Sequence, residues 1–375
     1  MIRKWLLGVI CFIYLNGCSQ RIPLEQASLI LLIALDRTSN GEMKVGTSIP
    51  LFHHEKQKST AEHWVQASTI YDGFSKMDTK LTGYVTSSKA EVILIGKKFA
   101  QERNWIQALD SSYRDPYATI NAKVMIVDGP AEEIFNIKRP DKPAFPSYIS
   151  DVIKSSIQNN QSVSSTIQQL MREKNEQGMT QTVPIIKKIK NEIDTVGIAF
   201  LDQQGKYIAK IPKKDVKFFN LIYKPKSAGR MILHLVLSPK KSDKKPNTSI
   251  LVQNAKRKIN VDFQKGKFVF TIDVNMNIAL IEKTNKGVTK NRLQGNTHIS
   301  RLEREIKQEL DKKLQGMLQD MQKNKIDPIG LSLYARAFQY NEWKKVKADW
   351  VYALSKAKVH VNTHITIKDT GTIRY

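Results

Sequence analysis

The residue with the most clearly defined chemistry is Cys18. It follows Leu15-Asn16-Gly17 at the end of an apolar stretch of eleven residues, Trp5–Leu15. A bilayer-spanning helix needs about 20 residues, so this stretch has the length expected of the apolar region of a signal peptide. A small residue directly before a cysteine at this place resembles a bacterial lipobox, whose thiol takes a diacylglyceryl group before the chain is cut. We therefore predict a signal peptide over residues 1–17 and lipidation of Cys18.

Lipidation would leave the mature chain without a free thiol. The second cysteine of the chain, Cys11, lies inside the predicted signal peptide. A disulfide, a thiol nucleophile and a cysteine metal site are then excluded. Two acyl chains are sufficient for stable anchoring, whereas one is marginal. The alternative interpretation is an unmodified, buried Cys18 near an ordinary N-terminal helix.

The other reactive side chains form no catalytic or cofactor-binding pattern. The sequence has no phosphate-binding loop, dinucleotide-binding glycine motif, serine nucleophile elbow or H-E-x-x-H zinc motif. His53 and His54 are adjacent and point to different faces, so with His63 we expect a polar loop and no metal ion. His360 and His364 lie in a predicted strand, where four residues span about 13 Å, too far to share one ion. We predict no enzymatic activity, no metal and no cofactor.

The first part of the chain predicts alternating strands and helices, as in an α/β unit. A turn at 37–41 predicts a hairpin between the first two strands. The three prolines of segment 139–146 mark a boundary. The expected elements are strands over 29–35, 43–51, 91–96 and 122–128, and helices over 63–77, 98–109 and 131–137.

The second part predicts helices within 150–182, followed by a hairpin over 197–211. The strongest helix is expected over 300–324, where Ser300 and Glu303 form a capping box. Two shorter helices are expected after it, the first over 331–340 and the second around Trp343 and Trp350. The predicted strands are 230–237, 268–281 and 359–367.

The positive charge gathers in the middle of the chain. Residues 205–270 hold 17 Lys or Arg and 3 Asp, so this segment supplies +14 of the formal charge of +25. Export would separate the protein from nucleic acid, which leaves anionic lipid head groups and wall polymers as anionic neighbours. Two interpretations remain open for the basic loop 238–247. It is either a solvated hairpin tip or a surface that meets such polymers.

The order of several short segments resembles that of the Ger(x)C family, the lipoprotein C-subunit of nutrient germinant receptors in Bacillus-type endospores. The resemblance begins at the lipobox and covers nearly the whole chain. It departs from the family before Ala34, where an apolar segment replaces the usual Thr-Gly pair, and in the linker 140–190, where no motif matches. The matching segments are Ala34-Leu35-Asp36, Ala90–Gly96, Phe99-Ala100, Tyr113-Arg114-Asp115-Pro116, Gly129–Phe135, Gly197–Phe200, Asp327-Pro328-Ile329-Gly330, Trp343, Trp350 and Asp369-Thr370-Gly371.

The resemblance implies a mixed α/β, multi-domain fold, with three distinct α/β domains in series after the lipoprotein signal peptide. We place these domains at 18–145, 146–225 (with the hairpin) and 226–375. The protein would be anchored by Cys18 to the outer face of the spore inner membrane. It would act with integral-membrane A- and B-subunits in a coupling or assembly role without catalysis.

Two other classes remain as alternatives. A substrate-binding lipoprotein of a transporter also has a lipobox, but it usually has two similar lobes, and this sequence shows no internal repeat. A cell-wall enzyme needs carboxylates or a metal in a cleft, which the sequence does not place.

Overall fold

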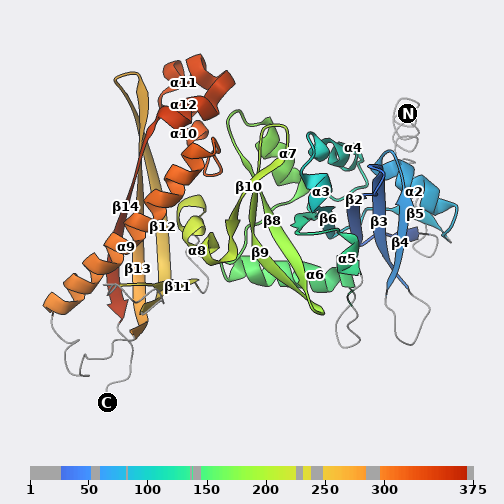
Figure 1. Cartoon of the computed structure of the whole chain (residues 1–375), viewed down its shortest axis with the longest axis horizontal. Coiled ribbons are helices and arrows are strands. Elements are labelled where there is room, and N and C mark those ends of the chain that lie inside the picture. Colours follow the sequence, from blue (N-terminus) through green and yellow to red (C-terminus); the bar gives the residue numbers. More distant parts are fainter. Residues whose placement is uncertain are drawn as a thin grey trace, which may run out of the picture.

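The computed structural model describes residues 27–51, 60–81, 83–135, 137, 145–224, 231–237, 248–283 and 296–369. The predicted lipobox with Cys18 and Cys11, the histidines His53 and His54, and the basic loop 238–247 lie outside these residues. Two sheets side by side dominate the molecule (Figure 1). One has eight strands in the order β10-β9-β8-β7-β6-β2-β3-β4, and the other has four in the order β11-β12-β13-β14. A short parallel pair, β1 (Ala27–Leu29) and β5 (Tyr84–Thr86), forms a separate two-stranded sheet.

The centre of the eight-stranded sheet is parallel. Strands β2 (Leu32–Arg37), β6 (Val92–Gly96) and β7 (Lys123–Val127) run in the same direction, and β3 (Met43–Pro50) pairs antiparallel with β2. This confirms the hairpin and the buried strands predicted for this region. The buried residues of β2, β6 and β7 form continuous apolar runs because helices cover both faces of the sheet.

The sheet continues past the boundary expected at residue 145. Strand β7 pairs in parallel with β8 (Gln181–Ile189), which is followed by β9 (Glu192–Leu201) and β10 (Tyr207–Pro212). The antiparallel pairing of β9 with β10 confirms the predicted second hairpin. One sheet therefore spans the segments assigned to the first two predicted domains, and the three-domain division stays a prediction.

Helices cover the two faces of this sheet with separate apolar clusters. The first cluster contains Ile33, Ile93 and Ile126 of the strands, and the second contains Leu32 and Leu94. The helices against the first face are α2 (Ile70–Asp78), α3 (Lys97–Ala100), the 3₁₀ turn η2 (Trp105–Leu109) and α7 (Ile167–Asn175). Those against the second are α5 (Glu132–Phe135) and α6 (Phe145–Gln158). A further short helix, α4 (Asp110–Arg114), follows η2.

The helix predicted over 63–77 is wrong in its first part. Residues Thr60–Gln66 form strand β4, and helix α2 begins only at Ile70, after Thr69 caps it by accepting a hydrogen bond from the Asp72 N–H. The spacing of Trp64 matched a helix, but pairing with β3 satisfies the backbone of this segment instead. The helix predicted over 98–109 is likewise divided between α3 and η2.

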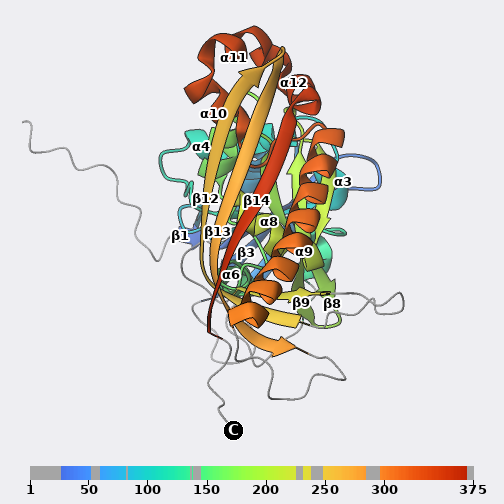
Figure 2. The same cartoon turned by 90° about the vertical axis from the view of Figure 1, so that its left-hand side faces the viewer.

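The four-stranded sheet has three long strands and the short strand β11, and the long helix α9 lies beside it (Figure 2). The predicted strands near 230, 268 and 359 are confirmed. Strand β12 (Thr248–Gln264) was not predicted, because Lys256 and Lys258 on its exposed face interrupt the apolar pattern. Part of the basic middle segment therefore lies on one face of a strand. The strands are β11 (Met231–Leu235), β12 (Thr248–Gln264), β13 (Lys267–Lys283) and β14 (Lys358–Asp369). The helices are α8 (Lys213–Tyr223), α9 (Asn296–Lys323), α10 (Leu331–Phe338), α11 (Tyr340–Val346) and α12 (Trp350–Lys356), with the short turn η3 (Lys347–Asp349).

The long helix is confirmed, but its predicted capping box is wrong. Helix α9 begins at Asn296, so Ser300 lies inside the helix. The Glu303 carboxylate accepts a hydrogen bond from the N–H of Ile367 on β14 at 2.8 Å. No helix among the described residues is long and apolar enough to cross a bilayer.

Candidate functional sites

Three segments of the family pattern meet at the Asp36 carboxylate. Asp36 is the last residue but one of β2 and is 5% exposed. Its Oδ2 accepts a hydrogen bond from the N–H of Glu132 at 3.1 Å, at the start of α5. A Cβ atom on Gly96 would lie 1.7 Å from Asp36 Oδ1, so only glycine fits beside this carboxylate. Burial raises the pKa of Asp36 to about 6, and the N–H groups of Glu132 and Ala131 oppose this rise.

A second buried carboxylate, Asp327, organises the C-terminal helices. Its two oxygens accept hydrogen bonds from the N–H of Leu331 at 2.8 Å and of Ser332 at 2.7 Å, and from Trp350 Nε1 at 2.9 Å. Burial raises its pKa to about 6, against the effect of these donors. The Trp350 ring lies over Gly178, where an added Cβ would come within 2.4 Å of the ring.

Asp327 also joins two parts of the chain that are distant in sequence. Its backbone exchanges two hydrogen bonds with Thr180, one from Thr180 N to Asp327 O at 3.1 Å and one from Asp327 N to Thr180 Oγ1 at 2.8 Å. The Ser332 hydroxyl donates to Gln177 O at 2.6 Å and accepts from Trp343 Nε1 at 3.1 Å. We call this cluster the Asp327 junction, because it ties the turn before β8 of the eight-stranded sheet to the C-terminal helices.

The Tyr113–Pro116 segment forms a third polar cluster on the surface. The Tyr71 hydroxyl donates to Asp115 Oδ2, and Asp115 Oδ1 accepts from the N–H of Tyr117 at 2.8 Å. Partial burial and the bond to Asp115 raise the pKa of the Tyr71 hydroxyl. Tyr117 itself is 73% exposed. This arrangement stabilises the loop after α4.

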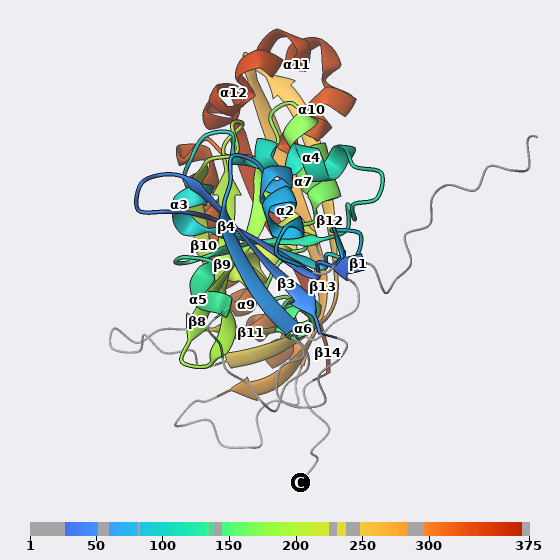
Figure 3. The same ribbon diagram turned by 90° about the vertical axis from the view of Figure 1, so that its right-hand side faces the viewer.

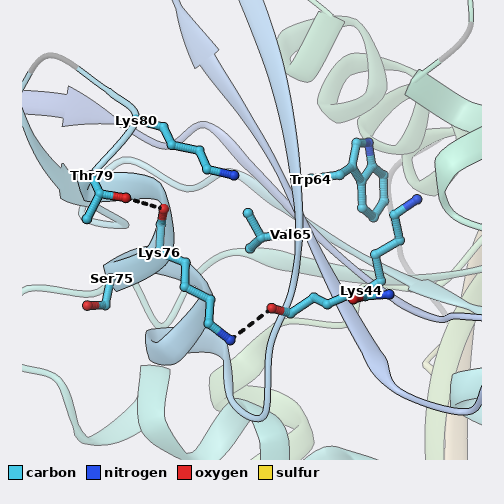
Figure 4. Close-up of a pocket in the computed structure, with 8 residues that line it drawn as sticks. Lys44, Trp64, Val65, Ser75, Lys76, Thr79 and Lys80 are labelled. Atoms are coloured by element: carbon cyan, nitrogen blue, oxygen red, sulfur yellow. Dashed lines mark hydrogen bonds between the residues drawn. The ribbon is translucent and has the colours of Figure 1, made fainter.

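Strands β3 and β4 and helix α2 lie at the outer end of the eight-stranded sheet (Figure 3). A groove of about 720 Å³ lies where they meet (Figure 4). It wraps around the edge strand β4, because Trp64 and Val65, neighbours on opposite faces of the strand, both line it. Its other lining residues are Lys44, Gln66, Ser75, Lys76, Thr79 and Lys80.

Three lysines line this groove, two of them in ion pairs and one without such a partner among the described residues. Lys44 Nζ lies 5.0 Å from the centre of the Trp64 ring and 2.7 Å from Glu132 Oε2. Lys76 Nζ donates to the backbone oxygen of Gln66 at 3.1 Å and lies 3.0 Å from Asp72. Lys80 is exposed, points toward β4, and has no ion pair within the described residues (Figure 4). The groove can therefore accept anionic groups, and sequence analysis missed it because Trp64 was assigned to a helix.

The histidines considered as metal ligands are not brought together. His63 lies on β4, while His360 and His364 both lie on β14 of the other sheet. His364 Nε2 is 3.6 Å from Asp273, but no three His, Cys, Asp or Glu side chains within the described ranges are grouped around a common point. The predictions of no metal, no cofactor and no catalysis stay predictions.

Comparison with known proteins covers nearly the whole chain. The family model described as "Spore germination protein N-terminal domain" matches residues 20–188, and "Spore germination B3/ GerAC like, C-terminal" matches residues 196–371. Spore germination protein GerQC of Bacillus cereus is 20% identical over 370 residues, covering 98% of this chain and 99% of the relative. Spore germination protein B3 of Bacillus subtilis (strain 168) is 24% identical over 368 residues, covering 96% and 95%.

A solved structure agrees with these matches. The crystal structure of the GerBC protein superposes with a TM-score of 0.55 at 19% identity, covering 90% of this chain and 96% of that chain. At this identity the match shows a shared fold, here a mixed α/β fold. Together with the two family models, the residue order from Asp36 to Asp327 places this chain among the spore germination proteins of the Ger(x)C family.

Proposed function

We propose that the protein is the lipid-anchored C-subunit of a nutrient germinant receptor. It acts with the integral-membrane A- and B-subunits at the outer face of the spore inner membrane. The observation that carries this proposal is the match of both family models, in order, over residues 20–188 and 196–371. The lipobox pattern that ends at Cys18 supports anchoring by lipid.

The role we propose is coupling or assembly, without catalysis. The two buried carboxylates support this role because a backbone N–H bonds to Asp36 Oδ2, and backbone and indole N–H groups bond to both oxygens of Asp327. A general base needs a free oxygen aimed at a substrate. The Asp327 junction instead links the two sheets, which suits a subunit that transmits or holds a conformation.

Deletion tests the receptor role. Spores that lack this chain should fail to respond to at least one nutrient germinant, measured as loss of refractility after nutrient addition. A plasmid copy of the wild-type gene should restore the response. Wild-type kinetics of the deletion strain with every amino acid and sugar tested would overturn the proposal.

Lipidation is tested at the two cysteines. Incorporation of radiolabelled palmitate should occur in the wild-type protein and in Cys11→Ala, because Cys11 leaves with the signal peptide. Cys18→Ala should incorporate no label and should fail to restore germination. Label in the Cys18→Ala protein would contradict the anchoring mechanism.

The coupling role is tested against direct substrate binding, as in a transporter-type binding protein. Calorimetry of the lipid-free protein with amino acids and sugars separates the two. The C-subunit proposal with a coupling role expects no heat of binding, whereas a substrate-binding lipoprotein binds its substrate directly.

A further inference from the structure

Strand β4 leaves one edge of the eight-stranded sheet open. In the part of the chain that the structure describes, β4 pairs with β3 alone. In an antiparallel pair, every second residue of a strand exchanges backbone hydrogen bonds with its neighbour strand. The Ala67 N–H donates to Met43 O, so counting back by twos, Val65, His63 and Ala61 are the residues of β4 that bond to β3. The N–H and C=O groups of the alternate residues therefore point away from the sheet, toward the groove.

The outward-pointing residues are Thr60, Glu62, Trp64 and Gln66. Of these backbone groups, the Gln66 oxygen accepts a hydrogen bond from Lys76 Nζ. No other described residue bonds to the outward N–H or C=O groups of Glu62 and Trp64. An open strand edge of this kind is a template for pairing with another extended chain.

The lysines beside the open edge of β4 favour an acidic strand as the partner that pairs with it. Lys44, Lys76 and Lys80 surround β4, and the whole chain carries a formal charge of +25. A second copy of this chain would bring the same lysines opposite each other, and like charges placed directly opposite are destabilising. An acidic strand would gain most from Lys80, which has no ion pair within the described residues, and less from Lys44 and Lys76, which already pair with Glu132 and Asp72.

We infer that the β4 edge receives an extended, acidic polypeptide segment of a membrane subunit, which adds to the sheet as a further strand. The identity of this partner rests on the proposed receptor function. Strand β4 has seven residues, so a segment of about five to seven residues matches its length. On one face of the added strand, an apolar side chain can pack on Trp64. On the other face, carboxylates reach Lys76 and Lys80.

The Trp64 ring is held in place for such a contact. It lies over Gly46 of β3, where an added Cβ would come within 2.6 Å of the ring, and it meets the Phe135 ring edge-on at 4.9 Å between centroids. A ring fixed in this way loses little side-chain entropy when a partner packs on it.

Replacing Glu62 by proline tests the inference by removing one backbone hydrogen bond, from the Glu62 N–H to the added strand. Glu62→Pro removes an outward N–H, while the bonds from Ala61 and His63 to β3 stay, and proline is tolerated on edge strands. Glu62→Ala is the matched control, because it also loses the side-chain bond to Thr60 but keeps the N–H. Circular dichroism and thermal unfolding should show that both variants fold.

The readout is photocrosslinking in spore membranes. A photoreactive amino acid in place of Ser75, an exposed groove residue, should crosslink the full-length protein to an A- or B-subunit. Glu62→Pro should lower this crosslink at least tenfold, Glu62→Ala less than twofold, and Lys80→Glu severalfold. An equal crosslink in Glu62→Pro and Glu62→Ala, or a crosslink to a second copy of this chain, would overturn the inference. Loss of the crosslink in Lys80→Glu alone would point to an anionic contact without strand pairing and would overturn it as well.

The receptor role is tested separately by the deletion strain. If deletion abolishes germination while folded Glu62→Pro germinates and crosslinks normally, the strand-addition inference fails and the receptor role stands. If the deletion strain germinates normally, the proposed function fails, while the crosslinking result still shows whether β4 has an extended partner.

Discussion

At Asp36 and Asp327, a buried carboxylate accepts hydrogen bonds from backbone N–H groups at the start of a short helix. The donor to Asp36 is Glu132, 96 residues further along the chain. The donors to Asp327 are Leu331 and Ser332, the first residues of helix α10. A buried charge is tolerated only where such donors compensate for lost hydration. Asp36 and Asp327 both belong to segments of the family pattern. In the structure each one fixes the start of a helix through these hydrogen bonds.

Gly96→Ala should destabilise the protein through the Asp36 site. The added Cβ would lie 1.7 Å from Asp36 Oδ1, so the carboxylate must leave the start of α5. Overpacking and the loss of this cap together should lower the free energy of unfolding by about 2–4 kcal/mol, measured by urea denaturation. Gly129→Ala is the control, because its Cβ would meet the carboxylate of Glu133 at 3.3 Å, a side chain that can move away. A change below about 0.5 kcal/mol in Gly96→Ala would contradict this geometry.

At the scale of elements, α9 covers the outer edge of β14 with its side chains. Three acceptors on the helix receive N–H groups of the strand: Glu303 from Ile367, Asp311 from Thr363 and Gln315 from Val361. Four helix residues advance about 6 Å and two strand residues about 6.6 Å, so acceptors four or eight residues apart along α9 match strand residues two or four apart on β14. This edge is closed by the chain itself, whereas no described residue pairs with the outer edge of β4.

Asp311→Ala should destabilise the C-terminal sheet. It leaves the N–H and hydroxyl of Thr363 without their acceptor, where the present distances are both 2.8 Å. An unsatisfied buried donor costs about 1–3 kcal/mol, to be measured by thermal or urea unfolding. Asp320→Ala on the same helix removes an exposed carboxylate and should change stability by less than about 0.5 kcal/mol. Equal effects of the two substitutions would argue against the side-chain ladder.

At the scale of the whole molecule, the Asp327 junction connects the two sheets, and its charge state depends on pH. The pKa of Asp36 and of Asp327 is raised from the ordinary 3.8 to about 6, chiefly by burial. Between these values the folded protein holds protons that the unfolded chain has released. The stabilising contribution is complete below pH 4 and is lost as pH rises to about 6.

The free energy of unfolding should therefore show a component that falls between pH 4 and pH 6. Each carboxyl should contribute on the order of 1–3 kcal/mol. Asp128, whose pKa Lys97 lowers, acts in the opposite direction, so the test compares the wild type with Asp36→Asn. Urea unfolding of the protein at several pH values should show a shallower fall in the variant. The same slope in both proteins would mean that Asp36 does not titrate in this range.

The sequence alone determined the features that depend on local pattern and on residue order. The buried strands near Leu35, Ile93 and Ile126 were recognised because continuous apolar runs are needed where both faces of a sheet are covered. The long helix ending at Lys323 was recognised from its apolar stripe. Family membership followed from the order of short motifs. The lipidation of Cys18 is also a local prediction, and it awaits the labelling experiment.

Only the tertiary structure decided which distant residues meet. Trp64 has helical spacing to its neighbours, yet pairing with β3 makes it part of a strand. Glu303 has the position of a capping residue, yet it bonds to Ile367 of β14. Gly96 reaches Asp36, and Thr180 reaches Asp327, across intervals that no local rule covers. Backbone groups bond to whichever partner folding brings near, so the open β4 edge and its lysine groove become visible only once the sheet has formed.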